Sequence, residues 1–226
     1  MRTALAAAAL LWAHASDAKC MRVELVPQVV TPAKATLPAD GGVLVGWSSS
    51  TDAEPSNTDP SVQATWKTGA ALTIETLAPG LSVYRTKATG AFTIVDAKRK
   101  AVGTFTAGGK VALDLPAPAP SSLVMSHSEG FRGGERYEID ATFAAIPAQA
   151  VALVLYKVAG DKRVPQSFTL VDRERKALAV YADPGHCGWN PPGTMRPAAT
   201  DAVELAWVDA YGRLSAPSAA LKLTTK

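Results

Sequence analysis

Short apolar segments separated by turn residues run through the whole chain, and they constrain the fold more than any other feature. The segments are rich in Val, Leu, Thr and aromatic residues, and clusters of Gly, Pro, Asp and Ser lie between them. Helical periodicity is almost absent after residue 20. This combination is typical of an all-β sandwich.

In the first half we expect strands at residues 21–30, 42–47, 62–67, 71–76, 82–86, 91–96 and 111–115, with 102–106 as an optional addition. In the second half we expect them at residues 123–127, 136–143, 151–158, 166–172, 177–182, 202–209 and 219–224. Trp47, Trp66 and Trp207 alternate with apolar strand residues, so we expect them in the core.

Prolines at alternate positions divide the chain. Pro116, Pro118 and Pro120 stiffen the backbone towards an extended polyproline form and remove donors that a sheet would need. We therefore predict a sandwich over 19–115, a Pro-rich linker over 116–122 and a second sandwich over 123–226. An edge strand interrupted by prolines is the alternative. Each half then has about 100 residues, which suits one β-sandwich domain.

The first 18 residues have the layout of a secretory signal peptide. Arg2 gives a basic start, residues 4–13 are apolar, and Ser16-Asp17-Ala18 is a small-x-small cleavage site. The apolar run is too short to span a membrane, and no later segment reaches that length. We therefore expect an exported protein, periplasmic or extracellular, without a transmembrane segment.

The composition narrows the function classes. With 47% hydrophobic residues the chain can fill a core, and a formal net charge of +3 is too small to argue for nucleic acid. The sequence has no Gly-x-Ser-x-Gly, no His-Glu-x-x-His and no Gly-rich phosphate loop. In Ser126-His127-Ser128-Glu129, neighbouring side chains on a strand point to opposite faces, so they cannot converge as a triad by sequence neighbourhood alone, and we favour a hydrogen-bonded histidine at a strand end. We expect a non-enzymatic protein without a cofactor, with hydrolase as the least favoured class.

Several segments resemble known sandwich domains. Residues 29–32 read Val-Val-Thr-Pro, and residues 37–45 pass through a Pro-x-Asp-Gly turn into an apolar strand. This resembles the opening of immunoglobulin-like domains of exported bacterial proteins. Residues 77–84, with Leu-x-Pro-Gly and a following Tyr, and residues 207–218, with an Asp-x-x-Gly turn, resemble fibronectin type III-like domains. The resemblance implies two such sandwiches with structural or binding work in the bacterial envelope or outside the cell. It leaves the partner and the oligomeric state open.

Two cysteines in an exported chain usually pair with each other, so we expect a Cys20–Cys187 disulfide. Unpaired thiols, or a bond to a partner, are the alternatives. In the immunoglobulin-like strand order that the resemblance implies, the start of the first sandwich and the loop before the sixth strand of the second would be far apart if the sandwiches were strung end to end. A bond between the two cysteines therefore requires the second sandwich to fold back beside the first. We therefore predict a compact side-by-side pair and not a rod.

Residues 183–200 form a long expected loop with four prolines and three glycines, and such loops are often functional. Trp189, flanked by Asn190 and near His186, is the best candidate for a residue that stacks on an envelope polysaccharide or anchors a protein partner. A tryptophan tucked beneath its own loop is the competing interpretation. Loop 48–61 would be displayed on the first sandwich in the same way.

A metal site is the alternative function. Four side chains would suit copper if the fold brought them together: Met125, His127, His186 and Met195. The Pro-Ala-Asp-Gly turn at residues 38–41 is also similar to one in periplasmic copper-carrier sandwiches. A disulfide at Cys187 would weaken this hypothesis.

Overall fold

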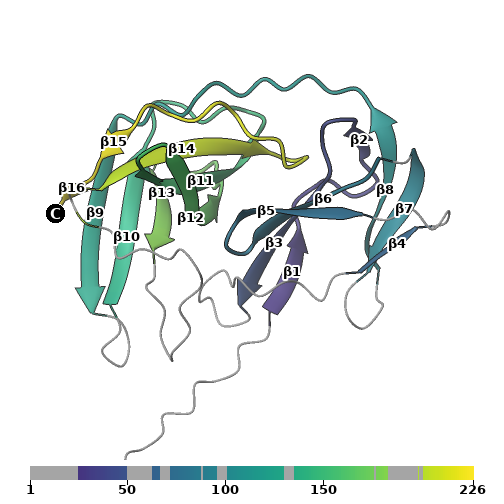
Figure 1. Cartoon of the computed structure of the whole chain (residues 1–226), viewed down its shortest axis with the longest axis horizontal. Coiled ribbons are helices and arrows are strands. Elements are labelled where there is room, and N and C mark those ends of the chain that lie inside the picture. The colour runs from purple at the N-terminus through teal and green to yellow at the C-terminus, as the bar shows by residue number, and fades with distance from the viewer. Residues whose placement is uncertain are drawn as a thin grey trace, which may run out of the picture.

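The computed structural model describes residues 25–49, 63–66, 72–87, 89–95, 101–129, 135–175, 177–182, 198 and 201–226. Every regular element within these residues is a β-strand, which confirms the predicted all-β class. Among these residues no helix has the length and apolar character needed to cross a membrane. The strands form two sandwiches that lie side by side (Figure 1).

The first sandwich has two four-stranded sheets. Sheet A has the order β1 (Leu25–Val29), β3 (Val43–Ser49), β6 (Leu81–Arg85) and β5 (Thr73–Ala78). Sheet B has the order β2 (Thr36–Pro38), β8 (Ala101–Gly109), β7 (Gly90–Val95) and β4 (Gln63–Trp66). In the immunoglobulin fold, strands A, B, E and D form one sheet and strands C, F and G form the other. If β1 and β2 are both counted as strand A, sheet A has the order A, B, E, D, and β8, β7 and β4 of sheet B are strands G, F and C.

The second sandwich also has two four-stranded sheets. Sheet C has the order β13 (Ala177–Ala182), β10 (Glu135–Thr142), β9 (Ser122–Glu129) and β16 (Thr224–Thr225). Sheet D has the order β12 (Lys162–Leu170), β11 (Ala150–Ala159), β14 (Ala202–Asp209) and β15 (Leu221–Lys222). Counted within this sandwich, the third strand is β11 and the fourth is β12. The two lie in the same sheet, as in fibronectin type III-like sandwiches.

Three apolar clusters hold these sheets in the layer order B, A, D, C. Leu37, Phe92, Ile94 and Phe105 of sheet B meet sheet A in the first cluster. Sheets C and D enclose the second, which includes Ile139, Leu155 and Trp207. The third cluster lies between the sandwiches, and we call it the central core. Its buried members are Leu44, Leu77, Ala78, Leu81 and Val83 from sheet A and Ala152, Val154 and Val208 from sheet D.

The central core explains why some strands are apolar at every position. On β3, Val43 and Val45 face sheet B while Leu44 faces sheet D. On β11, Leu153 faces sheet C and Val154 faces sheet A. The strands of a sheet that is covered on both faces need continuous apolar runs. In a sheet with one solvent-exposed face, apolar and polar residues alternate along each strand. The predicted side-by-side arrangement is therefore confirmed, although the cysteines from which we inferred it lie outside the described residues.

One predicted strand is wrong. Residues 111–115 belong to no sheet. They are part of an extended connector, residues 110–121, that runs from β8 to β9 along one side of the molecule (Figure 1). Their polar groups bond elsewhere: the carbonyl oxygens of Val111 and Ala112 accept from Arg213, and the Asp114 amide donates to the Gln149 side chain. These backbone groups are thus satisfied by side chains and not by a neighbouring strand.

The expected final strand, residues 219–224, is also broken. It forms two short strands that pair in different sheets: β15 pairs with β14 in sheet D, and β16 pairs with β9 in sheet C. Upstream of β15, the free edge of β14 is covered by two buried serines: the amides of Leu205 and Trp207 donate to the hydroxyls of Ser218 and Ser215, both at 3.0 Å. The predicted core position of Trp207 is confirmed, since it is 1% exposed. The side chains of Trp47 and Trp66 lie outside the described set.

Candidate functional site

A densely hydrogen-bonded polar centre lies at the turn at residues 209–213, which follows β14. The Asp209 carboxylate accepts from the backbone amides of Tyr211 and Arg213, both at 2.9 Å, and from the Arg213 guanidinium at 2.7–2.8 Å. Gly212 has φ +70°, which side-chain-bearing residues rarely adopt. Asp209 and Arg213 thus fold the turn on themselves, and both side chains are at most 5% exposed.

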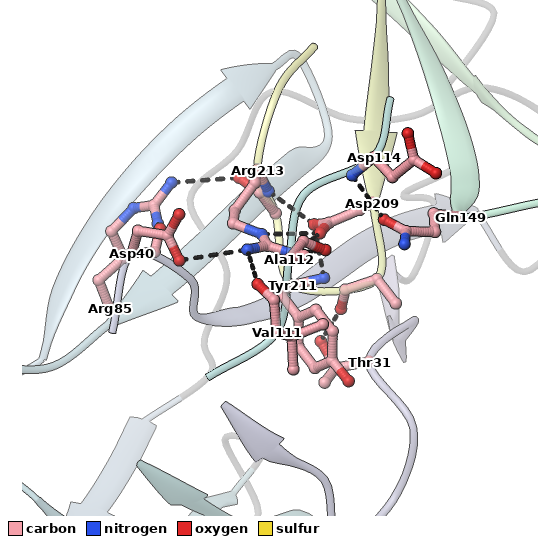
Figure 2. A network of polar contacts seen from close by, with 12 residues as sticks. Thr31, Asp40, Arg85, Val111, Ala112, Asp114, Gln149, Asp209, Tyr211 and Arg213 are labelled. Carbon is pink, nitrogen blue, oxygen red and sulfur yellow. Dashed lines mark hydrogen bonds and ion pairs between the residues drawn. The ribbon is translucent and has the colours of Figure 1, made fainter. Parts of the chain in front are cut away.

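This turn belongs to the second sandwich but lies against the first (Figure 2). The Gly42 amide donates to the Tyr211 carbonyl at 2.8 Å, and the Thr31 hydroxyl donates to the Ala210 carbonyl at 2.6 Å. The same Thr31 oxygen accepts from the Leu44 amide at 2.7 Å, so this buried hydroxyl links the turn to β3.

The Arg213 guanidinium reaches three further groups. One terminal nitrogen donates to the Val111 carbonyl at 2.6 Å and lies 3.3 Å from the Asp40 carboxylate. The other donates to Ala112 at 3.4 Å as well as to Asp209. Arg85 adds bonds to the carbonyls of Asp40 and Gly212, the latter at 3.1 Å. We call turn 209–213, turn 38–42 and connector residues 110–114 together the joint.

The chemistry of the joint is structural. Each N–H of the Arg213 guanidinium already has an oxygen acceptor within the protein. Removing one member of a buried, hydrogen-bonded ion pair is strongly destabilising because the other charge loses its partner. The Asp209–Arg213 pair itself lies within the second sandwich. The bonds that cross to the first include those from the Gly42 amide, the Thr31 hydroxyl and the Arg85 guanidinium to turn 209–213.

A second polar cluster lies where sheets A and D approach each other, and it adjoins the joint through Arg85. Glu75 accepts from Arg85 at 2.8 Å, and Arg163 donates to the buried Glu204. Burial raises the pKa of Tyr156 to about 12; the charge of Arg163 opposes this rise and the charge of Glu75 adds to it. Tyr156 is thus a neutral phenol at physiological pH. Both carboxylates are already paired with arginines.

Of the predicted site residues, the structure describes two. His127 is exposed on β9, and its ring stacks on Tyr137 with 4.8 Å between centroids. Met125, two residues earlier, is 6% exposed and packs in the core between sheets C and D. A copper site that used Met125 would have to open that core.

The other predicted site residues lie outside the described residues: Cys20, His186, Cys187, Trp189, Asn190 and Met195. The disulfide, the recognition loop and the full metal set therefore stay predictions. Within the part of the chain that the structure describes, no three His, Cys, Asp or Glu side chains are grouped so that they could hold a metal ion.

The joint was missed at the sequence level. The Asp-x-x-Gly pattern predicted the turn, and the turn is present, but nothing local showed that it contacts the first sandwich. The sequence offered only the pair Asp209 and Arg213, four residues apart around the turn, and this spacing does not by itself show that the pair is buried.

Comparisons with known proteins add little. No protein-family model matches the chain, and no curated protein matches its sequence. Among solved structures, the FN1–FN3 domains of chicken CNTN1 are similar, with 9% identity over 87% of this chain and 69% of that chain and a TM-score of 0.33. We draw nothing on function from a likeness this low, and the fold assignment rests on the strand order itself.

Proposed function

We propose that this chain is an exported, non-enzymatic structural or binding protein of the bacterial envelope or exterior. The predicted loop 48–61 begins later than expected, because Ser48 and Ser49 belong to β3. In this proposal, the rest of that segment, residues 50–61, and loop 183–200 are displayed on a rigid pair of sandwiches and contact an envelope polysaccharide or a protein partner. Trp189 supplies the stacking surface, with Asn190 and His186 as neighbouring polar groups.

One observation carries the proposal: the two sandwiches share an apolar central core and a buried polar joint. Loops on a rigid scaffold are a common arrangement for binding, because the scaffold holds them in place before the partner arrives. The strands that precede the two loops, β3 and β13, each lie in a sheet that faces a packed core.

The Cys20–Cys187 disulfide remains part of the proposal. Cys20 precedes the start of β1 by five residues, and Cys187 follows the end of β13 by five residues. In an oxidising compartment, a bond between them would tie the first sandwich to the recognition loop.

A pull-down tests the proposal. Purified protein beginning at Lys19 is immobilised and exposed to fractionated envelope polysaccharide and envelope protein, beside Trp189→Ala and the same-loop control Thr194→Ala. We expect one fraction to be retained by the wild type and the control and lost by Trp189→Ala. Equal retention by all three variants would remove Trp189 from the proposal, and no retention from any fraction would contradict the binding role.

A further inference from the structure

The connector between the sandwiches is hydrogen-bonded to the protein near both of its ends. Arg213 holds the carbonyls of Val111 and Ala112, and the Gln149 side chain accepts from the Asp114 amide at 3.0 Å. At the far end, the Ser121 amide donates to the Thr142 carbonyl at 2.8 Å. A flexible linker would leave such backbone groups to water, whereas here the protein itself holds them.

Cutting the chain after Ala117 would separate the joint into two sets of residues. Asp40, Thr31 and residues 110–114 would lie on the N-terminal piece, and turn 209–213 on the C-terminal piece (Figure 2). All the bonds that turn 209–213 makes to Asp40, Gly42, Thr31 and the connector are therefore non-covalent contacts between the two pieces.

Arg213 explains why the connector passes where it does. The guanidinium is 5% exposed, and on its outer side the Val111 and Ala112 carbonyls and the exposed Asp40 carboxylate complete its set of acceptors. Without these acceptors, a charged group at this depth would keep only Asp209 as a partner. Burying an arginine in that state costs free energy that the joint avoids.

We propose that residues 110–114 act as a strap in a non-covalent joint with turns 38–42 and 209–213, and that this joint fixes the orientation of the two sandwiches even when the chain between them is cut. The connector then serves as a structural part of the interface as well as a tether. Loops on the two sandwiches are consequently held at one angle.

A nicked protein tests this directly. A specific protease site is inserted after exposed Ala117, a position where insertion is tolerated because the flanking bonds lie on either side of it. Cys20→Ser and Cys187→Ser are included so that no disulfide can hold the pieces together. The folded full-length chain is then cut, and its mass is followed by light scattering over a dilution series.

We expect the nicked protein to keep the mass of the intact chain at micromolar concentration. Arg213→Lys preserves the charge but loses the planar fork, and we expect it to weaken association about 10- to 100-fold. Arg173→Ala is the matched control, because Arg173 also donates to backbone carbonyls but does so within the second sandwich. We expect it to leave association unchanged.

Separation of the nicked wild-type pieces at micromolar concentration would overturn the proposal. So would an Arg213→Lys variant that associates like wild type, because the central core alone would then hold the sandwiches. If uncut Arg213→Lys fails to fold by circular dichroism, Thr31→Val replaces it. This variant keeps the side-chain shape and removes the hydroxyl bond to Ala210, but it also leaves the buried Leu44 amide without its acceptor, so the fold of the uncut variant is checked by circular dichroism first. With the fold retained, we expect association to weaken at least several-fold.

Discussion

Gly212 gives a sharp test of how the 209–213 turn fits against the first sandwich. A Cβ at this position would lie 2.4 Å from a Val83 methyl carbon and 2.7 Å from the Val83 Cβ. The residue also has φ +70°. Gly212→Ala therefore meets two penalties, backbone strain of about 1–2 kcal/mol and overpacking against a fully buried valine of about 1–3 kcal/mol.

The two penalties can be separated with a matched control. Gly160, in the β11–β12 hairpin, has φ +60° but no atom within 4 Å of its added Cβ. Gly160→Ala therefore carries the backbone strain without the contact. We expect a loss of unfolding free energy of about 2–5 kcal/mol for Gly212→Ala and about 1–2 kcal/mol for Gly160→Ala.

Urea unfolding of the two variants measures both losses, provided that the m-value stays constant. The difference between them reports the contact between the turn and Val83. Equal losses in the two variants would refute the reasoning, because they would show that the turn does not press on the first sandwich.

Three further predictions follow from other parts of the structure. Ser218→Ala removes the hydroxyl that accepts from the buried Leu205 amide, and we expect urea unfolding to show a loss of about 1–3 kcal/mol of unfolding free energy. The control Ser121→Ala removes an exposed hydroxyl, and we expect no measurable change in unfolding free energy. The raised pKa of Tyr156 means that the folded protein binds its proton more tightly than the unfolded chain does. Stability from this group is therefore complete below pH 10 and is lost as pH rises towards 12, and Tyr156→Phe should lose less stability between pH 9 and 11 than wild type. Calorimetric titration with copper should give no binding heat; a saturable heat that disappears in His127→Ala would revive the metal hypothesis.

Much of the fold could be predicted from the sequence because its signals are local. The strand at 202–209 matches β14 and the strand at 177–182 matches β13, since both are short β-rich runs between turn residues. The segment 111–115 has the same local character, yet it forms no strand. Its partner is Arg213, about 100 residues away, and no local pattern carries that information.

The candidate site could be predicted less well for the same reason. Asp209 and Gly212 mark a turn by themselves, whereas the role of that turn depends on Thr31, Asp40 and Val83 in the other half of the chain. Continuous apolar runs such as β3 did hold a usable signal. A strand that is apolar on both faces implies a sheet that is covered on both sides. It therefore implies a contact between the two sandwiches in addition to the contact inside each sandwich.

Native-state hydrogen exchange tests the central claim, that the two sandwiches form one unit through the central core and the joint. The informative amides are those of Val45 in the first sandwich and Leu155 in the second, both on strands buried on each face. We predict that both exchange only through global unfolding, with the same opening free energy and the same dependence on denaturant. Two different opening free energies, each with its own smaller denaturant dependence, would show that the sandwiches unfold separately and would contradict the account.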